Sequence, residues 1–331
     1  MNSSPAQPAP RIAVIVPAYG VAQFLPAALD SLQAQSLGDW EAIVIDDGAP
    51  DDVAGAVQPY LADPRIRFLQ TSNGGVSSAR NRAIAEARAP LIALLDGDDL
   101  FRPDYLAAMV AAMDADPYAC IATCNARVFG AVAIESEVVQ AGQNRTATGT
   151  LADLLCGRLN IYIGSTFRRA DFEAIGGFDP AMTHAEDLDL WVRLFLHGGH
   201  VRYVDAVLGD YRVRGVSASR HLLKMIRGNM CVYDKIIAAR PGSREAELAL
   251  TLRTREEDRV AVEEAVAAVI AGDTDVALRA LRTHRRQMRN PGWSLAFALW
   301  QIFPRLAPPM LAWRQSRHAT TVAPSPEFRA G

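Results

Sequence analysis

The feature of this chain that most limits its fold is an alternation of short apolar runs with amphipathic stretches in its first third. Apolar, β-branched runs predict buried strands at residues 12–16, 40–45, 66–69 and 91–95, about every 25 residues. Stretches with apolar side chains at helical spacing separate these runs. This order is typical of an α/β fold, a Rossmann-type, mostly parallel sheet with helices on both faces.

Composition excludes several classes of protein. Hydrophobic residues make up 50% of the 331 residues, enough for a sizeable core in one large domain or in one domain with an appendage. A formal net charge of -3 gives no electrostatic reason to expect nucleic acid as a partner. The four cysteines show no paired Cys-x-x-Cys spacing and no nearby histidine cluster. This argues against a zinc site or a disulfide framework and indicates a reducing compartment.

The polar, proline-rich residues 1–10 predict a disordered lead-in and not a signal peptide, because they contain neither a basic nor an apolar region. No stretch reaches the roughly 18 uninterrupted apolar residues that a membrane-spanning helix needs. We therefore expect a cytoplasmic protein whose membrane contact is limited to peripheral association at the inner face of the membrane.

Three carboxylates follow the strand predicted at residues 91–95, at Asp96, Asp98 and Asp99. Carboxylate oxygens packed this closely repel one another unless a cation lies between them, and Mg²⁺ and Mn²⁺ prefer all-oxygen ligands. The alternative is an acidic loop in which Asp98 or Asp99 caps the helix predicted at 103–113. For an isolated Asp-x-Asp, capping is the commoner role, because short acidic motifs are weak signals.

The loop after the first predicted strand, residues 17–22, excludes two classes of nucleotide-binding protein. It lacks the Gly-x-Gly-x-x-Gly of dinucleotide-binding dehydrogenases, and the chain contains no P-loop pattern. A bound nucleotide would therefore have its phosphates held by a metal ion and not by a glycine cradle.

Six motifs occur in the order seen in family 2 glycosyltransferases of the GT-A fold, which the chain resembles over residues 10–215. Each motif alone is weak evidence, but six in register are specific. The resemblance implies a metal-dependent, inverting glycosyltransferase that uses Mn²⁺ or Mg²⁺. The motifs are I-V-P-A-Y at 15–19, I-D-D-G at 45–48, N-G-G-V-S-S-A-R-N at 73–81, L-D-G-D-D at 95–99, G-G-F-D at 176–179 and E-D-L-D-L-W at 186–191.

The resemblance also implies roles for the residues of a donor site. The implied donor is a nucleotide-diphosphate sugar, usually a UDP-sugar in this family. Asp96 would face its ribose and sugar, and Asp98 or Asp99 would hold the metal. Asp47 would accept a hydrogen bond from uracil N3–H. Three further residues complete the donor set: Pro17, Tyr19 and Arg80.

Alternatives remain open for two of these residues. Tyr19 borders the base or is an ordinary aromatic at the rim of a sheet. Arg80 approaches the phosphates, pairs with a site carboxylate, or is a solvated arginine on a helix. Many relatives carry a histidine where this chain has Arg214, which could instead contact the diphosphate.

For the acceptor, the resemblance implies that Asp187 is the general base that takes the proton of the attacking hydroxyl, with Glu186 beside it. One-step attack opposite the leaving group inverts the anomeric carbon. The alternative is that both carboxylates only stabilise the N-terminus of a helix. Family habit suggests a glycan or a lipid-linked acceptor in surface polysaccharide assembly.

Two other functions compete with glycosyl transfer. A sugar-phosphate nucleotidyltransferase also uses an α/β sheet and a metal, but it needs a glycine-rich, basic loop after the first strand. A non-catalytic carbohydrate-binding or scaffold protein would be expected to have lost site carboxylates. Here Asp47, Asp96, Asp98 and Asp187 are all present.

We expect the catalytic domain to span residues 11–218 and a helical extension to span 219–290. Residues 291–331 comprise a Trp-rich apolar segment, 291–314, and a disordered tail. A basic helix followed by such a segment is typical of an interfacial membrane anchor. The segment could equally pack on the catalytic domain or on a second subunit, because Trp and Phe are ordinary core residues.

Overall fold

The computed structural model describes residues 9–214, 222–271 and four short pieces: 283, 295–296, 299–300 and 303–311. The chain divides into two compact units, residues 1–214 and 215–331. The predicted tail and most of the predicted lead-in fall outside the described residues. Among the helices that are described, none combines the length and the apolarity that crossing a bilayer requires.

The first unit is built on one sheet with the strand order β3-β2-β1-β4-β9-β6-β10-β5. Four of these strands are parallel, as predicted: β3 (Ile66–Thr71), β2 (Trp40–Asp47), β1 (Ile12–Ala18) and β4 (Leu91–Leu94). Because their carboxyl ends lie at the same edge of the sheet, the loops that follow β1, β2 and β4 lie close together.

The other half of the sheet is mixed. β9 (Thr166–Arg168) runs antiparallel to β4 and to β6 (Ala119–Gly130). The strand predicted over 161–168 is too long, because a tight turn in which Ser165 N–H donates to the Ile163 carbonyl (2.7 Å) interrupts it. The predicted irregular excursion over 126–149 holds the end of β6 and two short strands, β7 (Ser136–Glu137) and β8 (Thr148–Gly149).

A long strand that the sequence analysis did not predict, β10 (His200–Val213), runs parallel to β6. Its register against β6 shifts between Val204 and Val207 and again between Val207 and Gly209. The edge of β10 that does not face β6 pairs, at Gly209 and Asp210, with the two-residue strand β5 (Leu100–Phe101). β5 comes directly after the acidic turn. The end of β10 is thereby brought next to Asp98 and Asp99.

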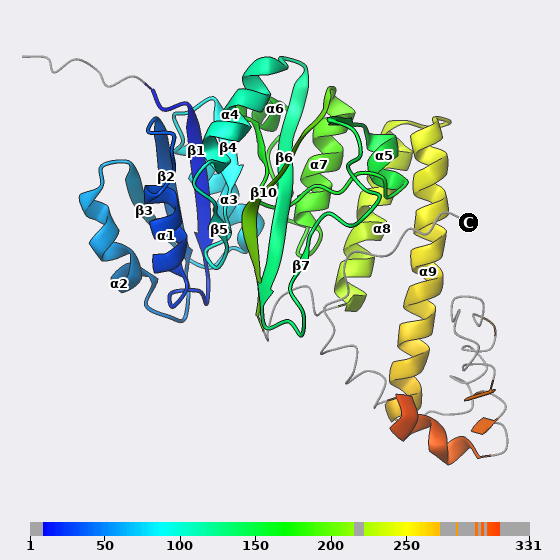
Figure 1. Cartoon of the computed structure of the whole chain (residues 1–331). Coiled ribbons are helices and arrows are strands. Elements are labelled where there is room, and N and C mark those ends of the chain that lie inside the picture. The colour runs from blue at the N-terminus through cyan, green and yellow to red at the C-terminus, as the bar shows by residue number, and fades with distance from the viewer. Residues whose placement is uncertain are drawn as a thin grey trace, which may run out of the picture. The chain divides into compact units, whose positions relative to one another are not determined.

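Helices cover both faces of the sheet (Figure 1). α1 (Leu25–Gln33), α2 (Val53–Val57) and α4 (Tyr105–Ala115) share one hydrophobic core with β1 and β2. α3 (Val76–Ala85) packs on the other side of β1 and β2. On that side a cluster of aromatic rings joins β9 to α6 (Arg169–Ala174) and α7 (Glu186–His197): Phe167, Phe172, Phe178 and Trp191.

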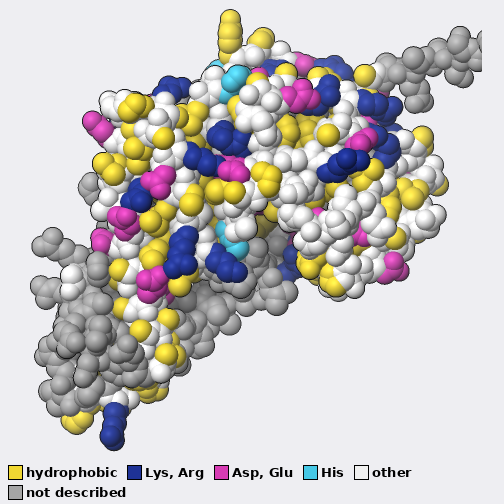
Figure 2. Space-filling view, turned by 180° about the vertical axis from the view of Figure 1, so that it is seen from behind, with side chains coloured by type: hydrophobic (Ala, Val, Ile, Leu, Met, Phe, Trp, Pro, Cys, Tyr) yellow, Lys and Arg dark blue, Asp and Glu magenta, His cyan; other side chains and the backbone are white. Residues whose placement is uncertain are grey.

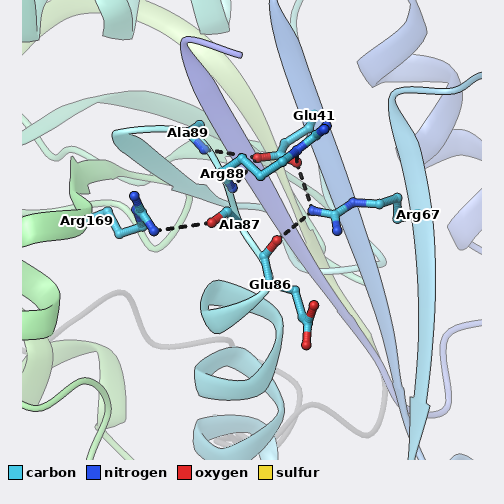
Figure 3. A network of polar contacts seen from close by, with 7 residues as sticks. All are labelled: Glu41, Arg67, Glu86, Ala87, Arg88, Ala89 and Arg169. Atoms are coloured by element: carbon cyan, nitrogen blue, oxygen red, sulfur yellow. Dashed lines mark hydrogen bonds and ion pairs between the residues drawn. The ribbon is translucent and has the colours of Figure 1, made fainter. Parts of the chain in front are cut away.

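A buried ionic network lies at the amino end of β2, opposite the edge that carries the predicted site (Figure 3). Glu41 is 1% exposed and accepts hydrogen bonds from Arg67 Nη2 (2.8 Å) and Arg88 Nε (3.2 Å). It also accepts from the backbone N–H groups of Arg88 (2.6 Å) and Ala89 (3.0 Å). Arg67 in turn donates to the Glu86 carbonyl (2.7 Å), so the network ties β2 and β3 to the end of α3.

The second unit contains the helical C-terminal region that the composition predicts. α8 (Leu222–Ala239) and α9 (Arg244–Ala271) pack against each other. The last turns of α9 form a small core with the described part of the Trp-rich segment. Its buried members are Val262, Ala265, Val266, Val269, Trp300, Ala307 and Leu311.

The surface seen from behind carries acidic and basic side chains interspersed with apolar ones (Figure 2). This mixed surface agrees with the small formal net charge of -3.

Candidate active site

The turn after β4 carries the predicted acidic residues and packs closely on the loop after β1. Gly97 permits this approach, because a Cβ there would lie 2.9 Å from Val21 Cγ2 and 3.1 Å from the Pro17 carbonyl oxygen. The predicted capping role is wrong: the N-cap residue of α4 is Asp104, and neither Asp98 nor Asp99 occupies that position.

Burial and the charge of Asp96 raise the proton affinity of the two carboxylates that follow Asp96 in this turn, Asp98 and Asp99. Burial is the main cause that raises the pKa of Asp98 to about 6, and the charge of Asp96 is the second. The charge of Arg214 acts in the opposite direction. Burial and the charges of Asp96 and Asp98 likewise raise the pKa of Asp99, which is 1% exposed. A bound cation relieves this kind of repulsion.

Two arginines at the end of β10 supply positive charge to the turn. Arg214 Nε lies 2.5 Å from Asp98 Oδ2, and Arg214 Nη1 donates to the Gly20 carbonyl (3.0 Å). The Arg212 N–H donates to Asp99 Oδ1 (2.7 Å), and Arg212 Nε donates to the Asp98 carbonyl (2.8 Å). Arg214 was assigned a possible role from the sequence, whereas Arg212 was not, because the strand that carries Arg212 was not predicted.

Arg80 connects the acidic turn to α7. This side chain is 2% exposed; its Nη2 donates to Asp96 Oδ1 (2.7 Å) and its Nη1 donates to Glu186 Oε1 (3.0 Å). Burial lowers the pKa of Arg80, but the charges of Asp96 and Glu186 outweigh burial and raise that pKa above its ordinary value. The alternative of a solvated helix arginine is wrong, because this guanidinium is buried between two carboxylates.

The face of α3 that carries Arg80 also holds the segment before α7. Ser77, Arg80 and Asn81 are spaced at i, i+3 and i+4, so they share one face of the helix. Asn81 Nδ2 donates to the Phe178 carbonyl and Asn81 Oδ1 accepts from the Phe178 N–H, both at 2.8 Å. Ser77 Oγ donates to the Met182 carbonyl (3.3 Å). Ser77 and Asn81 were assigned no role from the sequence, although their spacing from Arg80 places all three on one helix face.

α7 begins with the two carboxylates predicted for catalysis. Ala185, just before the helix, has φ = 59°, a left-handed conformation that is uncommon outside glycine. Glu186 is paired with Arg80, whereas Asp187 Oδ1 accepts from the N–H of Leu188 (2.8 Å). Burial, and then the charge of Glu186, raise the pKa of Asp187 to about 6. That value suits a general base that works near neutral pH.

Asp47, at the end of β2, holds the glycine loop that leads into α3. Its Oδ1 accepts from the Gly74 N–H (2.8 Å) and its Oδ2 accepts from the Gly75 N–H (2.9 Å). Gly48 allows the close approach, since it has φ = 65° and a Cβ there would lie 2.7 Å from Asn73 N. A carboxylate has about four acceptor positions. The predicted contact with a nucleobase is therefore compatible with these two bonds.

The other two predicted donor residues lie at the end of β1 and in the loop that follows it. Pro17 is still in the sheet, opposite Ile45, whereas Tyr19 lies beyond the strand and is 52% exposed. Asp51, which sequence analysis did not identify, holds this loop by accepting from the N–H groups of Gly20 (3.0 Å) and Ala22 (2.6 Å). The exposed Tyr19 ring is accessible to a planar ligand.

The described residues include no group of three or more His, Cys, Asp and Glu side chains arranged to hold a metal ion by themselves. Mg²⁺ is commonly held in another way, by one or two carboxylates together with substrate phosphates. The mutual repulsion of Asp96, Asp98 and Asp99 fits a divalent ion bound in this way. Asp98 fits the role of ligand better than Asp99, which is 1% exposed and bonded to the Arg212 backbone.

Comparison with known proteins gives the family. Residues 13–175 match the family model described as Glycosyl transferase family 2. These residues, about half of the chain, form a domain of that family. One relative is the putative teichuronic acid biosynthesis glycosyltransferase TuaG of Bacillus subtilis, which is 26% identical to the family 2 chain over 230 residues. The matched region covers 69% of this chain and 88% of TuaG.

A second relative is much longer than this family 2 chain. It is the uncharacterized protein y4gI of Sinorhizobium fredii, 33% identical over 222 residues, or 64% of this chain and 23% of that protein. The chain spans about a quarter of the length of this and two further curated relatives.

Solved structures confirm the GT-A fold of the family 2 chain. S. aureus TarS 1-349 in complex with UDP-GlcNAc superposes with a TM-score of 0.63 at 16% identity, over 83% of this chain and 80% of that one. The mannosyltransferase PcManGT from Pyrobaculum calidifontis, in complex with GDP-Man and Mn²⁺, superposes with a TM-score of 0.56 at 20% identity, over 93% and 87% of the two chains.

Proposed function

We propose that this family 2 chain transfers a sugar from a UDP-sugar to a hydroxyl group with inversion at the anomeric carbon. The observation that carries the proposal is the position of Arg80, which bonds Asp96 of the acidic turn and Glu186 beside Asp187. Residues proposed for the donor and the residue proposed as the base therefore belong to one site. Displacement at carbon needs a stabilised leaving group on one side and a base on the other.

On the donor side, Asp96 faces the ribose and sugar, and Asp47 accepts from the uracil N3–H. Tyr19 and Pro17 border the base at the end of β1, where Tyr19 is exposed. The complexes of TarS with UDP-GlcNAc and of PcManGT with GDP-Man support a nucleoside-diphosphate sugar as the donor class. The choice of uridine rests on the carboxylate at Asp47.

Asp98 would hold a Mn²⁺ or Mg²⁺ ion, with Asp99 behind it. Such an ion neutralises the charge that develops on the leaving diphosphate. Since Arg214 is paired with Asp98 here, we expect Arg214 to leave that carboxylate when the donor binds, which makes its guanidinium available to the diphosphate. The PcManGT complex with Mn²⁺ supports the choice of metal.

On the acceptor side, Asp187 takes the proton of the attacking hydroxyl. With a pKa of about 6 it is ionised at neutral pH, which a base requires. Glu186 is paired with Arg80 and positions the start of α7. The acceptor that we propose is a glycan or lipid-linked sugar of a surface polysaccharide, supported by the name of TuaG, a putative teichuronic acid biosynthesis enzyme.

The test is the variant Asp187→Asn, measured by release of UDP from a UDP-sugar in the presence of Mn²⁺ and a panel of acceptors. Loss of the base should lower kcat by roughly 10² to 10⁴-fold, while the donor still raises the melting temperature. Glu173→Gln, a change at a 61% exposed carboxylate on α6, is the matched control and should leave turnover unchanged. Unchanged turnover in Asp187→Asn would remove Asp187 from the mechanism.

A further inference from the structure

In the described part of the Trp-rich segment, some apolar side chains are buried against α9 and others are exposed to solvent. Trp300, Ala307 and Leu311 are at most 1% exposed and pack against the end of α9. Five other large apolar side chains of the segment remain 37–76% exposed. We call these five the apolar strip: Leu295, Leu299, Phe303, Leu306 and Met310.

The strip is continuous in the sequence pattern. Its members follow one another at intervals of three or four residues in the sequence, although Phe303 lies outside the described helical residues and Pro304–Leu306 is a 3-10 helix. Contiguous exposed apolar side chains of this size mark interaction sites, in contrast to single ones scattered over a surface. The packing of Trp300 on α9, with its Nε1 bonded to Met310 Sδ (3.3 Å), fixes which side chains are left outside.

The charge of the surrounding sequence indicates the partner. Residues 276–326 contain no Asp or Glu, although the chain has 37 acidic residues, and they carry eight arginines. This stretch therefore has a formal charge of +8, and the rest of the chain has -11, since the whole is -3. The eight are Arg279, Arg282, Arg285, Arg286, Arg289, Arg305, Arg314 and Arg317.

We propose that the apolar strip inserts into the surface of an anionic lipid bilayer, to which the positive charge of this stretch of sequence attracts the chain. Apolar side chains set among cationic ones are what an interfacial contact with anionic lipid requires. A second copy of this chain fits less well, because two +8 segments would repel each other at the interface. Nucleic acid fits less well too, because Phe303 is the one aromatic side chain of the strip that could stack on bases.

The full-length protein can test this by flotation with phosphatidylcholine vesicles and with vesicles that also contain phosphatidylglycerol. We expect binding to the anionic vesicles alone, weakened by added salt because the lipid charge is screened. The double variant Leu295→Gln/Phe303→Gln should lower the partition coefficient about tenfold or more. Leu250→Gln, at a 55% exposed side chain on α9, is the matched control and should bind as the wild type does.

Three results would overturn the proposal: no flotation with anionic vesicles, equal flotation with neutral vesicles, or equal flotation of the double variant and the wild type. Light scattering on the same samples detects the competing occupant. A dimer that the double variant abolishes would assign the strip to a second copy of the chain. Melting curves of both variants should match the wild type, because the substituted side chains are exposed.

Discussion

At the scale of single residues, Arg80 is the side chain on which the geometry of the site depends most. Replacing it in Arg80→Met leaves Asp96 and Glu186 without their shared cation. We expect the free energy of unfolding to fall by roughly 3 kcal/mol, because a buried ion pair loses one partner. Transfer activity should fall as well, since the acidic turn and α7 are no longer linked.

Chemical denaturation measures the loss of stability. Arg82→Gln lies on the same helix, but its side chain is 64% exposed and its ion pair with Glu86 is 3.6 Å long. That control should change stability by less than about 0.5 kcal/mol. If both variants unfold at the same denaturant concentration, Arg80 has no special structural role.

The pKa of Asp187 predicts how activity depends on pH. A general base works when it is deprotonated, and burial together with Glu186 raises this pKa to about 6. Activity at saturating donor and Mn²⁺ should therefore rise through about pH 6 and level off above it. The residual activity of Asp187→Asn should lack this dependence, and a persisting step would assign the titration to another group.

At the scale of elements, the network around Glu41 secures the end of the sheet that lies away from the site. Glu41→Gln keeps the size of the side chain but removes its charge and one of the two oxygens that accept four hydrogen bonds. We expect a loss of roughly 2 kcal/mol in unfolding free energy, with kcat unchanged in the folded fraction.

Denaturation curves and turnover measured on the same preparations separate the two effects. Glu86→Gln changes a neighbouring side chain that is 42% exposed and should have little effect on either quantity. A lower kcat in Glu41→Gln at full folding would show that the amino end of β2 influences the site.

Elements that the sequence predicted well are those whose residues are uniformly buried. β2 and β4 are buried along their whole length, so β4 reads as a continuous apolar run and β2 as an apolar run that only Glu41 interrupts; acidic residues end β2 and follow β4 closely. β10 was missed because only part of it is buried and because Asp205, Gly209 and three register shifts interrupt any regular alternation. The candidate site followed the same division: acidic motifs at strand ends were found, whereas Arg212 on β10 was not.

At the scale of the whole molecule, binding of donor and metal should be visible as a gain in stability. A ligand present at a hundred times its dissociation constant stabilises the native state by about 2.7 kcal/mol. We expect a UDP-sugar and Mn²⁺ together to raise the melting temperature more than either alone, because the diphosphate completes the ligands that Asp98 begins. Differential scanning fluorimetry over a panel of nucleotide sugars measures this.

Asp98→Asn should remove the part of the gain that depends on Mn²⁺. An equal shift with and without the metal would contradict the metal site and would point to Arg214 as the group that holds the diphosphate. GDP-sugars serve as the comparison for the nucleobase, since Asp47 is expected to favour uridine.

The irregular stretch of β10 has a consequence for how this site tolerates insertions and deletions. Side chains of a strand alternate between its two faces, so a shift of one residue turns each to the opposite side. Inserting one residue between 205 and 208 would put Tyr211 and Val213 in the positions from which Arg212 and Arg214 now bond Asp99 and Asp98. The number of residues in the stretch 205–208, and not their chemistry, therefore decides whether a positively charged side chain lies next to Asp98.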